Sequence, residues 1–424
     1  MLTIDRSGLS PLTHTLSNGQ PLHLFQDTAI EIVKIDITFE AGPCYQDKKL
    51  VAVTTNKLLT EGTLRHSAAE IAQFMDFRGI IIDTTVNSFI ASVTAYALRR
   101  HVTELIPMLH EILTQPAFAQ HEFQIAMARR RQQLLTSLQK TSILSHHIFY
   151  RELFGPDHIL GNWAVSDDTY NITIDDIRNF FRDHYQLGTA RYIISGHYDD
   201  TILRCFDDYF GHAPAAPRRE LPTIPVPVRQ PSVFSATLPN AVQSSLRIGR
   251  ILPVPHASNE FSQFIVLNTL LGGYFGSRLM NNLREDKGYT YGIHSQTRLI
   301  RGAIIFSVST DVRAADTQAA LREIYREMQR LCDEPVPDQE LELVRSYLAG
   351  DFLRAIDGIF ERAERFHLID TNGIDENFTD RALDTLESVT PQQLQALARS
   401  LLQRDRMTQV VVGPESPQPA TIID

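Results

Sequence analysis

Two halves of this chain repeat the same local pattern, and an internal repeat restricts the possible folds more than any other feature of the sequence. Residues 171–196 and 388–413 each have, as their third residue, a Thr suited to a helix N-cap. Each continues with helical spacing of apolar residues and ends in a β-branched run closed by Gly. Two long predicted helices, which follow Pro116 and Pro335, form a second pair, and a third pair is looser. The pairs occur in the same order with offsets of 217, 219 and 212 residues. This order predicts an internal duplication.

A proline-rich segment, 213–231, divides the chain almost in half and contains six prolines. Proline fixes φ and lacks a backbone donor, so this segment is predicted to be an extended, semi-rigid linker. We therefore predict one domain over 1–212 and a second over 232–424.

Each half mixes predicted strands with long amphipathic helices. This mixture predicts an α+β fold, in which an antiparallel-rich sheet backed by helices occurs twice. The predicted strands are Ile32–Phe39, Ile80–Val86, Ser88–Ala95 and Arg191–Ser195 in the first half, and Ser244–Ile248, Gly302–Thr310 and Thr408–Val412 in the second.

Composition excludes several classes of protein. Forty residues are Lys or Arg and 50 are Asp or Glu, a net charge of −10 that argues against general binding to nucleic acid or anionic lipid. The three cysteines form no C-x-x-C pair, which argues against a disulfide scaffold or a thiolate zinc site. The N-terminus shows no signal-peptide pattern, and no apolar run reaches the ~18 residues of a membrane span. We therefore expect a cytoplasmic location.

Common catalytic motifs are missing from the sequence. It contains no G-x-S-x-G, no H-E-x-x-H and no G-x-x-x-x-G-K-[ST]. His110-Glu111 and His121-Glu122 begin H-E pairs without the second His, and we expect exposed polar residues on helices there. His146 and His147 are adjacent, so they point to different helix faces and cannot chelate one ion in the i, i+4 manner.

One segment, Phe39–Thr63, nevertheless resembles the zinc-site segment of the insulinase/pitrilysin peptidases, A-H-F-L-E-H-M-x-F-x-G-T. When Gly62-Thr63 is placed on the final G-T, Val53 falls on the first metal-binding His. Asn56 falls on the catalytic Glu, and Lys57 falls on the second metal-binding His. The resemblance places the third ligand, a Glu on a later helix, at Gln133.

These replacements remove the chemistry of a zinc peptidase. The H-x-x-E-H motif places two imidazoles on one helical face, beside a carboxylate that deprotonates the zinc-bound water. Valine has no donor atom, asparagine is a poor base, and the Lys57 ammonium would repel a dication. Residues 123–151 contain no Asp or Glu. We expect no metal ion bound by this chain.

The second half keeps a different family motif. Leu270–Gln296 resembles G-G-x-x-S-R-L-x-x-x-L-R-E-x-K-G-x-x-Y of the same family. The matching residues are Gly272, Gly273, Ser277, Arg278, Leu283, Arg284, Glu285, Lys287, Gly288 and Tyr291. In the family the Arg and Tyr of this segment bind substrate near the zinc of the facing half. The resemblance implies that role for Arg284 and Tyr291.

A simpler interpretation of the same residues involves no substrate. Arg284 to Lys287 would be a solvated helix end, Gly288 the residue that caps it, and Tyr291 a core aromatic.

The resemblance implies a catalytically inactive family member with two homologous halves. Some family enzymes are heterodimers, with zinc in one subunit and the Arg/Tyr pair in the other. We expect this chain to be the non-metal subunit beside an active subunit that carries H-x-x-E-H and zinc, and to help enclose peptide substrate. Two alternatives remain: a structural or peptide-binding homologue without a peptidase partner, and a zinc peptidase with atypical ligands.

Overall fold

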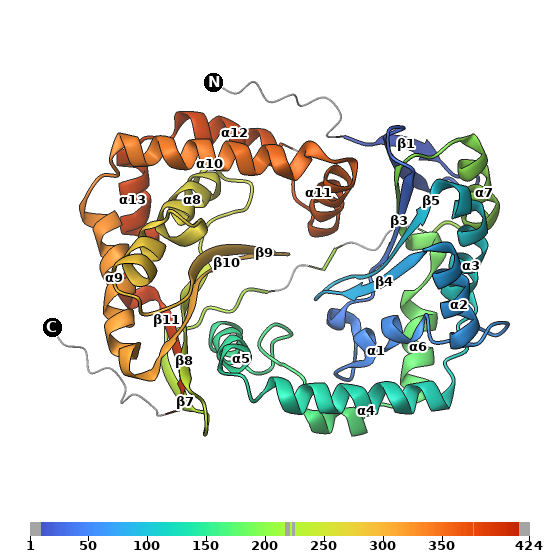
Figure 1. Cartoon of the computed structure of the whole chain (residues 1–424), viewed down its shortest axis with the longest axis horizontal. Coiled ribbons are helices and arrows are strands. Elements are labelled where there is room, and N and C mark those ends of the chain that lie inside the picture. Colours follow the sequence, from blue (N-terminus) through green and yellow to red (C-terminus); the bar gives the residue numbers. More distant parts are fainter. Residues whose placement is uncertain (1–9, 217–220, 223–224, 376, 415–424) are drawn as a thin grey trace. The chain divides into compact units, whose positions relative to one another are not determined.

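The chain forms two compact units, each built on one mixed sheet covered by helices (Figure 1). The predicted α+β class is confirmed. The computed structural model describes residues 10–216, 221–222, 225–375 and 377–414. The predicted absence of a signal peptide rests on residues 1–9, and part of the predicted linker is 217–220 and 223–224. These residues lie outside the described part of the chain.

The first unit contains a six-stranded sheet. In spatial order its strands are β1 (Leu12–Thr15), β2 (Pro21–Gln26), β6 (Arg191–Gly196), β3 (Ile32–Phe39), β5 (Ala91–Leu98) and β4 (Ile81–Val86). Its helices are α1 (Val51–Leu58), α2 (Ala68–Arg78), α3 (Val102–Thr114), α4 (Gln120–Ser137), α6 (Ile174–His184), α7 (Asp200–Phe210) and α11 (Ile359–Asn372).

The second unit contains a five-stranded sheet. In spatial order its strands are β7 (Val233–Thr237), β11 (Thr408–Gly413), β8 (Gln243–Leu252), β10 (Ala303–Arg313) and β9 (Ile293–Ile300). Its helices are α5 (Thr141–Phe154), α8 (Asn259–Asn268), α9 (Thr317–Asp333), most of α10 (Asp338–Asp357), α12 (Phe378–Ser388) and α13 (Pro391–Leu401), with π-helical segments at Thr269–Gly273 and Met280–Asp286.

The two sheets share one topology. From β2 onward the order β2-β6-β3-β5-β4 corresponds strand by strand to β7-β11-β8-β10-β9. In each sheet a single parallel pair, β2 with β6 or β7 with β11, occupies the same place, and the other pairs are antiparallel. A duplicated sequence requires this agreement.

The repeated tail segments form the predicted helix and strand in both units. The hydroxyl of Thr173 accepts a hydrogen bond from the backbone N–H of Asp176, and Thr390 accepts one from Gln393. In both caps the residue three positions on bonds back to the threonine N–H, which satisfies two orphan donors of the first turn. The predicted N-cap threonines are confirmed.

Each unit also holds a helix from the opposite half of the sequence. The helix α5 packs on β8 and β11 of the second unit, where Ser145 Oγ lies 3.1 Å from Ser245 Oγ. The helix α11 covers the first sheet, where Glu364 Oε1 lies 3.1 Å from Lys34 Nζ. The compact units therefore exchange a helix relative to the two sequence halves.

No helix in the part of the chain that the structure describes is long and apolar enough to cross a membrane.

Candidate functional site

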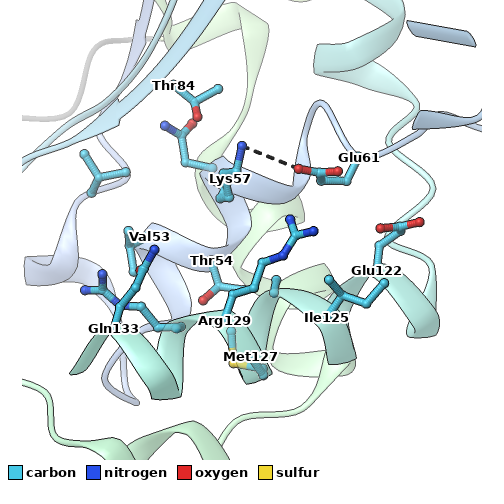
Figure 2. A pocket seen from close by; sticks show the side chains of 14 residues that line it. Val53, Thr54, Lys57, Glu61, Thr84, Glu122, Ile125, Met127, Arg129 and Gln133 are labelled. Carbon is cyan, nitrogen blue, oxygen red and sulfur yellow. Dashed lines mark ion pairs between the residues drawn. The ribbon is translucent and has the colours of Figure 1, made fainter. Parts of the chain in front are cut away.

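A pocket of about 250 Å³ in the first unit is lined by residues of α1, β4 and α4 (Figure 2). The structure brings together in it all four positions that the family resemblance aligned with the metal site. Val53, Asn56 and Lys57 come from α1, and Gln133 comes from α4. If the chain bound zinc at the positions aligned with the family's metal site, the ion would lie in this pocket.

The side chains on the pocket side of α1 offer no metal ligand. Val53 is half-buried and contributes only an apolar surface. The ammonium of Lys57 lies 3.4 Å from Glu61 Oε1 one turn later, an ion pair drawn in Figure 2. A fixed cation at this position opposes a divalent metal ion directly.

Asn56 is committed to holding the sheet rather than to chemistry. The residue is fully buried, and its Nδ2 donates to the backbone oxygens of Thr85 at 2.9 Å and Ser92 at 3.3 Å. Its Oδ1 accepts a hydrogen bond of 3.1 Å from the hydroxyl of Tyr185, whose pKa is raised by burial. An amide is too weak a base to take a proton from water, and the Oδ1 of Asn56 already accepts the bond from Tyr185.

The donor set of this pocket does not fit zinc, which takes thiolate, imidazole or carboxylate ligands in tetrahedral sites. Val53 supplies no donor, Lys57 supplies a cation, and the amide of Asn56 is bonded to the backbone and Tyr185. Across the residues that the structure describes, no group of three or more His, Cys, Asp or Glu is placed to hold a metal ion.

The expectation that His110-Glu111 and His121-Glu122 are exposed polar pairs is confirmed only for His121. His110 is half-buried against the rings of Tyr209 and Phe210, and neither glutamate is exposed. Glu111 is buried, accepts a hydrogen bond from Thr63 Oγ1 and lies 2.8 Å from His66 Nδ1. Burial alone would raise the pKa of Glu111, but these hydrogen bonds outweigh it and the pKa is lowered. Glu122 is half-buried and lines the pocket. Through these bonds Glu111 holds the loop that follows α1 in place. No local sequence pattern predicts this role.

The second candidate segment lies in the second unit, around the π-helical turn Met280–Asp286. Gly288 ends this turn at φ +61° and donates its N–H to Arg284 O at 3.2 Å. The predicted cap is confirmed. The guanidinium of Arg284 lies over the ring of Phe275, 4.7 Å from its centroid, and its Nε is 3.5 Å from Glu285 Oε1. Tyr291 is 93% exposed, so its interpretation as a core aromatic is wrong.

A half-buried ion pair anchors this segment. Arg278 donates to both carboxylate oxygens of Glu340 on α10, each at 2.8 Å, and the two side chains are 10% and 27% exposed. Such a forked pair fixes geometry well. Arg278 therefore supports the turn that carries Arg284.

Comparison with known proteins agrees with this pattern. Residues 171–348 match the family model described as peptidase M16 inactive domain. The chain is 20% identical over 415 residues to the non-peptidase homolog YmxG of Helicobacter pylori. This alignment covers 95% of this chain and 94% of that protein. This chain is similar to the inactive domain of M16 peptidases and to a non-peptidase homolog.

Other relatives of this chain carry peptidase names. It is 25% identical over 374 residues to an uncharacterized zinc protease of Streptomyces coelicolor, covering 84% of this chain and 79% of that protein.

Solved structures share the fold of this chain. A peptidase M16 inactive domain from Pseudomonas fluorescens superposes with a TM-score of 0.84 at 19% identity, covering 96% of this chain and 99% of that one. A protease from Helicobacter pylori superposes with a TM-score of 0.83 at 15% identity, covering 95% and 100%. The model match at 171–348 includes the Arg284 segment and leaves out the pocket on α1 and α4.

Proposed function

We propose that this chain is the non-metal subunit of a heterodimeric peptidase. In this role Arg284 and Tyr291 contact a peptide bound at the zinc site of an active subunit that carries H-x-x-E-H. The zinc and the water that attacks the peptide belong to that partner.

The observation that carries the proposal is the contrast between the two candidate segments. The positions aligned with the metal site hold no metal ligand, and Asn56 is bonded into the first sheet. In the second unit Tyr291 is 93% exposed at the end of a segment anchored by the half-buried pair of Arg278 and Glu340. A phenol exposed to this degree contributes little to the core, so its hydroxyl is available to a ligand.

The chemistry of the two side chains suits substrate binding beside a metal centre. The guanidinium of Arg284 presents forked donors to peptide carbonyl oxygens, and its stacking on Phe275 restricts its orientation. The hydroxyl of Tyr291 can donate a hydrogen bond to the oxyanion that forms during hydrolysis. Neither group requires a metal ion in its own chain.

We expect Arg284→Ala and Tyr291→Phe to lower kcat/KM of the reconstituted complex by about 100-fold or more where the lost donor serves the oxyanion. Their effect on the melting temperature should be small, because neither change opens a large buried cavity. The measurement is peptide turnover by the purified chain mixed with an intact H-x-x-E-H homologue, beside the melting temperature of each variant.

Arg278→Ala is the matched control, since it removes an arginine of the same segment that is buried in an ion pair. It should lower the melting temperature, because the carboxylate of Glu340 loses its partner. Wild-type turnover with both Arg284→Ala and Tyr291→Phe would contradict the role in trans. A fall in stability with unchanged turnover per folded complex would make both residues structural.

A further inference from the structure

The pocket between α1 and α4 is lined by two guanidinium groups that form no ion pair with a carboxylate within the described part of the chain. They belong to Arg129, which is exposed, and to Arg130. Arg130 is half-buried, its Nε is buried without a hydrogen-bond partner, and burial lowers its pKa. A desolvated cation in this state is stabilised by an anion that enters the pocket.

The rest of the pocket limits what that anion can be. Figure 2 shows Lys57 and Arg129 directed into the same space from facing helices, with Glu61 and Glu122 at one side. Lys57 is already paired with Glu61. With three cationic and two acidic side chains, the pocket carries one excess positive charge, which a singly charged anion would neutralise. A doubly charged phosphate would be repelled by the two carboxylates.

Part of the pocket wall is aliphatic. Val53 and Val86 contribute from α1 and β4, and Ile125, Ala126 and Met127 contribute from α4. The volume of about 250 Å³ is below the ~300–1,000 Å³ of pockets for drug-sized ligands. The space therefore suits one amino-acid residue rather than a length of peptide.

We propose that this pocket binds a monocarboxylate that carries an aliphatic group, supplied by the C-terminal residue of a peptide. Arg129 and Arg130 bind the carboxylate, and the aliphatic wall receives the side chain. The position that binds a cation in the active peptidases of this fold thus binds an anion here. The inference rests on the proposed function only in taking a peptide as the source of the carboxylate.

The test is binding of two fluorescein-labelled peptides of one sequence to the full-length chain alone, followed by fluorescence anisotropy. One peptide ends in a free Leu carboxylate and the other in Leu-amide. We expect the acid to bind at least about tenfold more tightly than the amide, because only the acid pairs with the arginines. The double variant Arg129→Gln/Arg130→Gln should remove this difference.

Arg131→Gln is the matched control, because Arg131 is the next residue of α4 and its guanidinium lies over the ring of Tyr170, 5.2 Å from the centroid, and not in the pocket. It should keep the preference for the acid. Competition by 4-methylpentanoate, a free aliphatic carboxylate, separates the two sources. If 4-methylpentanoate alone binds as tightly as the acid peptide, the carboxylate site stands and the peptide source is overturned.

Equal binding of acid and amide by the wild-type chain would overturn the proposal without any variant, and so would no binding of either. An unchanged preference in the Arg129→Gln/Arg130→Gln variant would also overturn it. None of these results bears on Arg284 and Tyr291, whose role is measured as turnover of the reconstituted complex.

Discussion

At the scale of single residues, Asn56 shows how a position aligned with the catalytic Glu of a family motif can serve stability instead. Its side chain joins α1 to the backbone of β4 and β5 and to the hydroxyl of Tyr185. All three partners are reached from a fully buried position. Loss of the amide leaves buried polar groups without partners, and each such group costs about 1–3 kcal/mol.

Asn56→Ala is therefore expected to lower the free energy of unfolding by about 2–4 kcal/mol. Lys57→Ala, one residue later, should change it by less than about 1 kcal/mol, because the Lys57 side chain is 62% exposed and its pair with Glu61 lies at the surface. Urea unfolding of both variants checks the prediction. Equal effects would show that the amide of Asn56 is not a structural anchor.

The sequence predicted which residues occupy the aligned metal-site positions, but not what they do instead. The family motif fixes Val53, Asn56 and Lys57 by their spacing alone. The partners of Asn56 lie 29, 36 and 129 residues away, so its role depends on contacts that no local pattern contains. For the same reason the sequence does not predict that the Nε of Arg130 is buried without a hydrogen-bond partner.

At the scale of elements, caps and periodicity predicted seven of the eleven strands that the structure describes, and β1, β2, β7 and β9 were not predicted. Turns explain the shifted bounds of a predicted strand. The strand predicted to start at Ser88 starts at Ala91 instead. Asn87 Oδ1 accepts the N–H groups of Phe89 and Ile90 at 2.9 and 3.0 Å, which makes these residues part of a turn. The exchange of α5 and α11 could not be predicted, because Lys34 and Glu364 are 330 residues apart.

The packing of α5 on its sheet makes the free energy of unfolding depend on pH. Burial, together with the positive charges of Arg247, His147 and Arg298, lowers the pKa of His146 to about 4. The folded state therefore keeps His146 neutral over a range in which the unfolded chain, with a pKa near 6.5, binds a proton. The linked stability is present above about pH 6.5 and is lost as the pH falls toward 4.

Between pH 7.5 and pH 5.0 this histidine should reduce the free energy of unfolding by about 2 kcal/mol. In His146→Asn the loss over the same interval should be smaller by that amount. Trp163 is the single tryptophan and stacks on His147, with ring centroids 5.2 Å apart, so its fluorescence reports on this helix during urea unfolding. Parallel pH profiles for the wild type and the variant would contradict the prediction.

At the scale of the whole molecule, the duplicated sequence predicted two sheets of one topology, and the structure has them. Metal binding is the whole-chain property that would separate this chain from an active zinc peptidase. We expect far less than one zinc per purified chain at neutral pH, because Val53, Lys57 and Gln133 replace all three ligands. Elemental analysis of the purified chain measures this.

Val53→His alone should restore neither zinc nor peptidase activity, since Lys57 still opposes the ion and Asn56 cannot act as a base. The smallest complete set is Val53→His, Asn56→Glu, Lys57→His and Gln133→Glu. In that set Asn56→Glu also removes the hydrogen bonds to the backbone oxygens of Thr85 and Ser92, because a carboxylate cannot donate them. A lower melting temperature is therefore expected. One tightly bound zinc or measurable turnover from the single substitution would show that the alignment is wrong.

The exchange of α5 and α11 also affects folding during translation, because neither unit has all of its elements until late in synthesis. The first unit lacks its covering helix until residues 359–371 have been synthesised, although its last strand, β6, ends at Gly196. The helix α5 leaves the ribosome before any strand of the sheet that receives it. For much of translation the nascent chain therefore exposes an unpartnered helix and an uncovered sheet. These are surfaces on which chaperones act, and the two units reach completion together near the end of synthesis.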